Sequence, residues 1–338
     1  MGDPQASLEQ VLAVLDAHRL LGDDGMLSRD VGLVSMGDHF DWGTAVDAQR
    51  ATADGVALFS WLLAHAPDQV CLIAGNHDLG RVGELSAFDD ATFAEVRARA
   101  RLAYDGKDAG LEAALLKDFP ALPTAELAAR DFAAFNVKQR ELVEQALFAG
   151  RLVAARAWGE DVLLLHAGLT NDEIDILGVA EDERASAPTI AAALNAALHQ
   201  ARARRPLSLR GLHEPGSAAH GEGGGMFYHR PTSGTVPGGP SRRRFDPRAA
   251  PRGLTQVIGH IGDDKCRQLM PDWTEGEPAP GKLRTLVLPV GERPVYRAGV
   301  QPGDTRLLFT DGAMSKQQAT SYELLDLDHM RALTPDLV

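Results

Sequence analysis

Apolar and polar positions alternate along the first eighty residues in a pattern that predicts helix, strand, helix, strand. Ser7 precedes apolar residues at helical spacing, which is typical of a capped amphipathic helix. Uninterrupted apolar runs at about 31–36 and 70–74 predict two buried strands, and the segment 45–66 between them has the apolar spacing of a helix. This connection leaves no room for a hairpin, so we expect the two strands to be parallel.

The rest of the chain divides into a helical stretch, a long loop and a strand-rich part. Residues 86–148 are Ala-rich and mostly helical in pattern, which predicts a helical insertion or flanking layer. Extended runs at 151–158 and 161–166 predict a hairpin, and 183–204 predicts another helix. Residues 211–253, rich in Gly, Pro and Arg, predict a long loop. Further strands are predicted at Gln256–Ile258, Arg284–Val290, Arg306–Thr310 and Tyr322–Leu327.

Length and charge narrow the classes of function. The 338 residues suffice for one large α/β domain, which we predict to span 1–338. The net charge of −13 argues against a nucleic-acid partner, but not against a small anionic substrate, because bound metal ions can reverse the local field. Cys71 and Cys266 are too few for a disulfide framework, and we expect no membrane span and no leader. These features predict a cytoplasmic protein.

Four short segments share one layout, in which an apolar strand ends in a tight polar turn. They are Gly37-Asp38-His39-Phe40-Asp41-Trp42-Gly43, Gly75-Asn76-His77-Asp78, His166-Ala167-Gly168 and Gly259-His260. Ligands bind at the carboxyl ends of strands in α/β sheets, so we expect these turns to meet at one rim. Carboxylate, amide and imidazole ligands suit divalent Mn, Fe or Zn. Each segment alone fits an ordinary turn or a core histidine, but all four in this order favour a metal site.

This series resembles the calcineurin-like metallophosphoesterases, and within them the bacterial phosphoprotein phosphatase and diadenosine tetraphosphatase branch. The matching motifs run from Gly2 to His260, and Thr310-Asp311-Gly312 resembles a segment near the end of such domains. The resemblance implies a four-layer α/β/β/α sandwich. It also implies hydrolysis of phosphoester or phosphoanhydride bonds by two divalent metal ions with a bridging hydroxide. Manganese is the expected metal, with iron or zinc as alternatives.

The resemblance also implies roles for individual residues. Asp38 would bridge the two metals, and Asp3 and Gln5 would hold the first one with it. The ligands completing the coordination of the second metal would be Asn76, His166 and His260. His77 would protonate the leaving oxygen, and Asp41 would orient its ring. Among possible substrate contacts are Arg230, which resembles a phosphate-binding arginine, and His39, for which a surface imidazole is the favoured interpretation.

Several positions depart from the family pattern. Gln5 replaces a histidine, Trp42 replaces an arginine that would clamp phosphate, and a second histidine after His260 is missing. The family has a buried strand before the first Gly-Asp, whereas Met1 directly precedes Gly2 here. We therefore expect either a truncated start or a poorly anchored Asp3.

The motifs leave the substrate open. Serine/threonine phosphatase-like and dinucleoside polyphosphatase-like activities both fit, with a phosphorylated small molecule, a nucleotide or a phosphoprotein as substrate. A non-catalytic or weakly active regulatory protein that retains the fold is the alternative, and a nucleic-acid phosphodiesterase is less favoured. The basic run Arg242, Arg243, Arg244, Arg248 and Arg252 suggests a further hypothesis, that the long loop covers the metals and contacts a polyanionic substrate.

Overall fold

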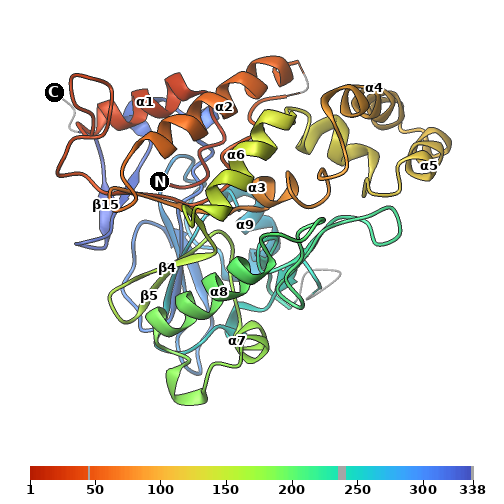
Figure 1. The fold of residues 1–338 in the computed structure, drawn as a ribbon. Helices are drawn as coiled ribbons and strands as arrows, with labels where there is room; N and C mark the ends of the chain where they lie inside the picture. The colour runs from red at the N-terminus through yellow and green to blue at the C-terminus, as the bar shows by residue number, and fades with distance from the viewer. Residues whose placement is uncertain (45, 235–240, 336–338) are drawn as a thin grey trace.

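Two β-sheets lie face to face in the middle of the molecule, with helices on their outer faces (Figure 1). The computed structural model describes residues 1–44, 46–234 and 241–335. The first sheet is parallel and consists, in order, of β1 (Leu33–Ser35), β2 (Val70–Ile73) and β3 (Leu152–Val153). The second is mixed, in the order β12 (Val295–Ala298), β11 (Arg284–Val287), β13 (Arg306–Phe309), β10 (Thr255–Ile258), β5 (Val162–Leu165) and β4 (Ala155–Trp158). The α/β class is therefore confirmed.

The side chains of each strand alternate between two apolar environments. Ile73 of the first sheet and Leu164 and Val257 of the second belong to one cluster between the sheets. Their neighbours Leu72 and Leu163 belong to the larger core that includes the helices. Because successive strand residues point to opposite faces, a strand covered on both sides reads as an uninterrupted apolar run. This is the pattern from which these strands were predicted.

Helices cover the outer face of each sheet. On the side of the first sheet lie α1 (Leu8–Ala17), α2 (Ala48–Ala64) and α6 (Val137–Phe148), whereas α8 (Ala187–Ala201) packs on β4 and β5. Shorter helices are α3 (Asn76–Gly80), α7 (Asn171–Leu177) and α9 (Asp263–Leu269). Single 3-10 turns occur at Glu181–Glu183, Pro247–Ala249, Pro271–Trp273, Met314–Lys316 and Ala319–Ser321. The predicted Ser7 cap is confirmed, since its hydroxyl accepts a hydrogen bond from the Gln10 N–H. No helix of the described ranges is long and apolar enough to cross a membrane.

The helical content predicted for 86–148 is present. The segment contains α4 (Asp90–Gly106), α5 (Ala109–Asp118), a π-helical turn (Leu127–Asp131) and α6. Figure 1 shows α4 and α5 projecting from one side of the molecule. They share a separate apolar cluster that contains Phe93 and Phe132. The assignment of 1–338 as one domain with this insertion stays a prediction.

The predicted loop 211–253 contains two small two-stranded sheets where it is described. One pairs β6 (His213–Glu214) with β7 (Gly224–Gly225), and the other pairs β8 (Arg230–Pro231) with β9 (Arg244–Phe245). Residues 235–240 of this loop, and Ala45 at the start of the predicted helix 45–66, lie outside the described residues.

Two features differ from the sequence prediction. The run 151–158 is divided between the sheets: β3 joins the first, and β4 forms the predicted hairpin with β5 in the second. The side chain of Asn195 stabilises this crossing by accepting hydrogen bonds from the backbone N–H groups of Ala154 and Ala155. The predicted strand Tyr322–Leu327 is present as β14 (Leu324–Asp326), whereas α9, β12 and β15 (Arg331–Leu333), which pairs with β14, were not predicted.

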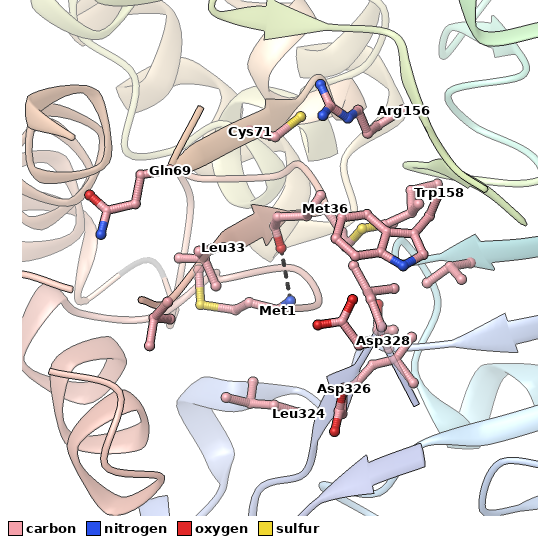
Figure 2. A pocket seen from close by; sticks show the side chains of 18 of the residues that line it. Met1, Leu33, Met36, Gln69, Cys71, Arg156, Trp158, Leu324, Asp326 and Asp328 are labelled. Atoms are coloured by element: carbon pink, nitrogen blue, oxygen red, sulfur yellow. Dashed lines mark hydrogen bonds between the residues drawn. The ribbon is translucent and has the colours of Figure 1, made fainter. Parts of the chain in front are cut away.

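Of the two alternatives given for the N-terminus, the poorly anchored Asp3 is wrong. Met1 is only 8% exposed, its N–H group donates to the Val34 carbonyl, and its own carbonyl accepts from the Met36 N–H. These bonds fix the segment along the free edge of β1, so that Asp3 is buried. Figure 2 shows Met1 lining a cavity of about 280 Å³ between the sheets, together with Trp158 and Leu324. Within the described part of the chain, its lining includes none of the candidate metal ligands.

Candidate metal centre

The four polar turns come from both sheets and meet where their strands end. Asp38 follows β1, Asn76 begins α3 directly after β2, His166 follows β5, and His260 follows β10. Asp38 and His260 have φ angles of 55° and 63°. This left-handed region is uncommon for residues other than glycine and is concentrated at functional sites. The expected common rim is therefore built from two sheets rather than one.

The ligand atoms of this rim lie close together. One atom each from Asp38, His166 and His260 falls within a group whose members are all within 4.8 Å of one another. His166 Nε2 lies 3.1 Å from Asn76 Oδ1, 3.1 Å from His260 Nδ1 and 3.5 Å from Asp38 Oδ1. Carboxylate, amide oxygen and two imidazoles thus converge on one point. This set of donor atoms fits a borderline divalent metal.

The orientation of the His166 ring is fixed by a hydrogen bond on the side facing away from the cluster. Its Nδ1 lies 2.8 Å from the Met36 carbonyl oxygen. A carbonyl oxygen only accepts, so Nδ1 carries the hydrogen and Nε2 faces the cluster. A histidine that ligates a metal commonly has such a backbone partner on its other nitrogen.

Asp3 reaches the same cluster from the N-terminal segment. Its Oδ2 accepts a hydrogen bond of 2.8 Å from the His260 N–H, and its Oδ1 lies 3.8 Å from His166 Nδ1. Within the described chain, buried Asp3 Oδ1 and His260 Nε2 have no hydrogen-bond partner. Unpaired buried polar atoms are costly, and a cation bound at either atom would offset that cost. Gln5 follows on the same segment and is partly buried.

The charges of the cluster favour a cation. Burial raises the pKa of Asp38, but His166 and His77 outweigh this effect and hold it well below its usual range. Burial lowers the pKa of His166, but Asp38 and Asp3 outweigh it and raise it to about 10. A buried imidazole that keeps a proton this strongly lies where positive charge is stabilised. By contrast, burial and the positive charge of Arg230 lower the pKa of His260.

Two glycines beside the ligands are required by space. A Cβ atom on Gly75 would lie 2.1 Å from Asp38 Oδ1, and one on Gly259 would lie 2.0 Å from Asp3 Oδ1. Both distances are far inside van der Waals contact. The glycines therefore let the carboxylates approach the neighbouring turns.

His77 stands beside the cluster and remains accessible. Its Nδ1 lies 2.9 Å from Asp41 Oδ2, its Nε2 lies 4.0 Å from Asp38 Oδ2, and its side chain is 16% exposed. Burial lowers the pKa of His77, but Asp38 and Asp41 outweigh this and raise it to about 9. An imidazole that is protonated at neutral pH and fixed by a carboxylate is suited to act as a general acid.

Arg81, whose role the sequence pattern did not indicate, stabilises this pair. Its guanidinium is fully buried, lies 2.6 Å from Asp41 Oδ2 and donates to the His77 carbonyl at 2.7 Å. It also packs against the rings of Phe40 and Phe132. The second motif has Trp42 in place of the family's arginine. Asp41 is nevertheless paired with an arginine, Arg81, which directly follows α3. The only sequence signal was the position of Arg81 four residues after His77.

The favoured interpretation of His39 as a surface imidazole is wrong. The residue is 1% exposed, with Nδ1 bonded to the Asp78 carboxylate and Nε2 2.9 Å from Ser35 Oγ. Asp78 also accepts from the backbone N–H groups of Asp38 and Gly75. The His39–Asp78 pair therefore connects the turn after β1 to the turn after β2 and does not line the site.

Arg230 lies on β8, and its charge acts on the residues of the centre. Burial lowers its pKa, and the negative charges of Asp131 and Asp38 act in the opposite direction. Its backbone N–H donates to the Arg243 carbonyl at 2.9 Å, which joins it to the basic run. Most of that run is neutralised by its own loop, in the pairs Arg242–Glu214, Arg243–Glu222 and Arg248–Asp246.

Comparisons with known proteins do not assign this chain to a family. No family model matches the chain, and no curated protein matches it. Among solved structures it is similar to a cold-active protein tyrosine phosphatase, with 13% identity and a TM-score of 0.39 over 96% of this chain and 71% of that chain. A likeness this distant does not define a family.

Proposed function

We propose that this protein is a metal-dependent phosphoester hydrolase of the calcineurin-like metallophosphoesterase type. The observation that carries the proposal is the convergence of Asp38, His166 and His260 beside the unpaired buried atoms of Asp3 and His260. Two sheets with helices outside are compatible with the sandwich implied by the sequence motifs. The proposed metal ligands are Asp3, Gln5, Asp38, Asn76, His166 and His260.

Each group of the site would have a separate role in the reaction. Two divalent ions, manganese by expectation, would supply a strong nucleophile and neutralise charge on the transferring phosphoryl group. His77 holds a proton at Nε2, facing the side of Asp38, and donates it to the leaving oxygen. Asp41 keeps the ring oriented, and Arg230 binds a phosphate oxygen through its guanidinium.

The substrate is an ester or anhydride of phosphate on a small molecule, nucleotide or protein. The accessible ring of His77 supports turnover rather than binding alone. The buried Asp41–Arg81 pair behind that ring fixes its orientation. The cytoplasmic location stays a prediction.

The test combines a metal count with an activity screen. The full chain is reconstituted with Mn²⁺, and turnover of para-nitrophenyl phosphate, its bis ester, phosphopeptides and diadenosine tetraphosphate is measured. We expect about two metal ions per chain and turnover of at least one substrate. A chain that binds one metal or none and turns over no substrate would favour the regulatory alternative.

Substituting His77 separates proton transfer from metal binding. We expect His77→Asn to lower kcat by roughly 10²–10⁴-fold, the usual contribution of a general acid, with metal content unchanged. His260→Asn should instead lose metal. Full activity of His77→Asn would remove the role proposed for this residue.

A further inference from the structure

A buried carboxylate and a buried imidazole face each other in a cavity outside the candidate centre. Glu173 lies on the first turn of α7, and His229 directly precedes β8. Each residue is at most 7% exposed, and His229 Nε2 lies 3.7 Å from Glu173 Oε1. The two side chains line a cavity of about 280 Å³. As far as the chain is described, none of the metal ligands proposed above lines this cavity.

Both side chains are held in place by their other polar atoms. His229 Nδ1 lies 3.1 Å from the Gly168 carbonyl oxygen. A carbonyl oxygen only accepts, so Nδ1 carries the hydrogen and the neutral ring has a lone pair on Nε2. Glu173 Oε2 accepts hydrogen bonds of 2.7 Å from the N–H and the hydroxyl group of Thr170. These bonds leave Glu173 Oε1 and His229 Nε2 facing each other.

Two acceptors that face each other in a buried site need a partner between them. Burial lowers the pKa of His229, with the charge of Glu173 acting in the opposite direction, which favours the neutral ring. A separation of 3.7 Å is also too long for a hydrogen bond, so a shared proton does not account for the pair. Zn–N and Zn–O bonds of about 2.0–2.2 Å place two donors of a tetrahedral ion roughly 3.4 Å apart. The observed separation is close to that value.

We propose that Glu173 and His229 bind a Zn²⁺ ion at a second metal site, with water molecules as its remaining ligands. The cavity has room for them, since one water takes roughly 30 Å³. An imidazole and a carboxylate bind Zn²⁺ or Co²⁺ more tightly than Mn²⁺, so this site differs in preference from the manganese expected at the candidate centre. The inference does not depend on the hydrolase proposal.

The second site would have a structural role. Glu173 belongs to α7, which follows the turn that carries His166, whereas His229 belongs to the loop 211–253. An ion held by both side chains ties this loop to the core. The bond from His229 to the Gly168 carbonyl connects the ion to the His166 turn. Zn²⁺ at this site should therefore stabilise the fold without taking part in turnover.

A Co²⁺ titration of the full chain tests the site by equilibrium dialysis and visible absorption. We expect the wild-type chain to bind about one more Co²⁺ than Glu173→Gln or His229→Asn. Glu173→Gln keeps an acceptor for Thr170, and His229→Asn keeps a donor for the Gly168 carbonyl, so both variants retain the bonds that hold these residues. His220→Asn is the matched control, because this exposed histidine of the same loop bonds to Ser217.

A second background removes the candidate centre. In the double variant Asp38→Asn, His260→Asn, the remaining Co²⁺ reports the second site alone. Adding Glu173→Gln or His229→Asn should weaken this binding at least roughly tenfold, the effect that even loss of an outer partner has on a metal site. Zn²⁺ should raise the thermal unfolding midpoint of the double variant but not of the triple variants.

The outcomes separate the second site from the candidate centre. Wild-type Co²⁺ counts that persist in both Glu173→Gln and His229→Asn overturn the second site and leave the hydrolase proposal standing. Absence of Co²⁺ from a folded double variant has the same consequence. Circular dichroism checks folding, and if the double variant does not fold, the wild-type comparison decides alone. Loss of one Co²⁺ with Mn²⁺-dependent turnover of para-nitrophenyl phosphate retained supports a separate site.

Discussion

At the scale of single residues, Asp41 connects the candidate general acid to the protein core. Its Oδ2 lies 2.9 Å from His77 Nδ1 and 2.6 Å from Arg81 Nη1. Burial raises the pKa of Asp41, but Arg81 and His77 outweigh burial and lower it. The carboxylate therefore stays ionised while it fixes the histidine ring. Arg81 contacts the His77 carbonyl and Asp41 but not the His77 ring nitrogens, which makes it a positioning residue.

The Asp41–Arg81 pair makes a prediction about stability. Arg81→Met leaves a buried carboxylate without its main partner and should lower the free energy of unfolding by about 3–5 kcal/mol. Asp41→Asn in the same chain removes that unpaired charge, so the double variant should be more stable than the sum of the single effects predicts. Urea unfolding of the four proteins at pH 7 measures this coupling. Strictly additive losses would show that the two side chains act independently.

At the scale of elements, the strands were predictable because each is short, apolar and ended by a polar turn. The pattern identified β1, β2, β5 and β10 together with the turns that follow them. It did not identify the burial of His39. The local sequence of a turn does not show whether its histidine faces solvent or a buried carboxylate such as Asp78. Arg81 was missed for a similar reason: its partner Asp41 lies forty residues earlier, and only the tertiary fold brings the two together.

The loop that follows α8 contains a buried histidine with a testable effect. His213 is fully buried between Phe227 and Tyr228, and neither ring nitrogen has a partner in the described chain. Burial lowers its pKa to about 3. The unfolded chain takes up a proton near pH 6.5 but the folded chain does not, so this residue destabilises the fold increasingly as pH falls from about 6.5 toward 3.

His213→Phe should therefore stabilise the protein, and more so in acid. The aromatic packing is kept, and no hydrogen bond is lost. Urea unfolding at pH 7 and pH 5 should give a larger gain in unfolding free energy at pH 5. His220→Asn is the comparison, since His220 is exposed and bonds to Ser217. An equal or smaller gain at pH 5 would mean that His213 is protonated in the folded protein.

At the scale of the whole molecule, the candidate centre exists only when the two sheets are packed together. Asp38 and Asn76 follow strands of the first sheet, whereas His166 and His260 follow strands of the second. The unfolded chain cannot offer these ligands at one point, so Mn²⁺ should bind the folded state selectively and raise its stability. At a free concentration about 1,000 times its Kd, the gain should be about 4 kcal/mol. Thermal unfolding across a Mn²⁺ titration measures this gain in stability, and a chelator should reverse it.

Variants of the centre assign the gain to its ligands. Asp38→Asn and His260→Asn should abolish most of the gain, whereas His77→Asn should keep it. An equal gain in all three variants would place the stabilising metal somewhere other than between the sheets.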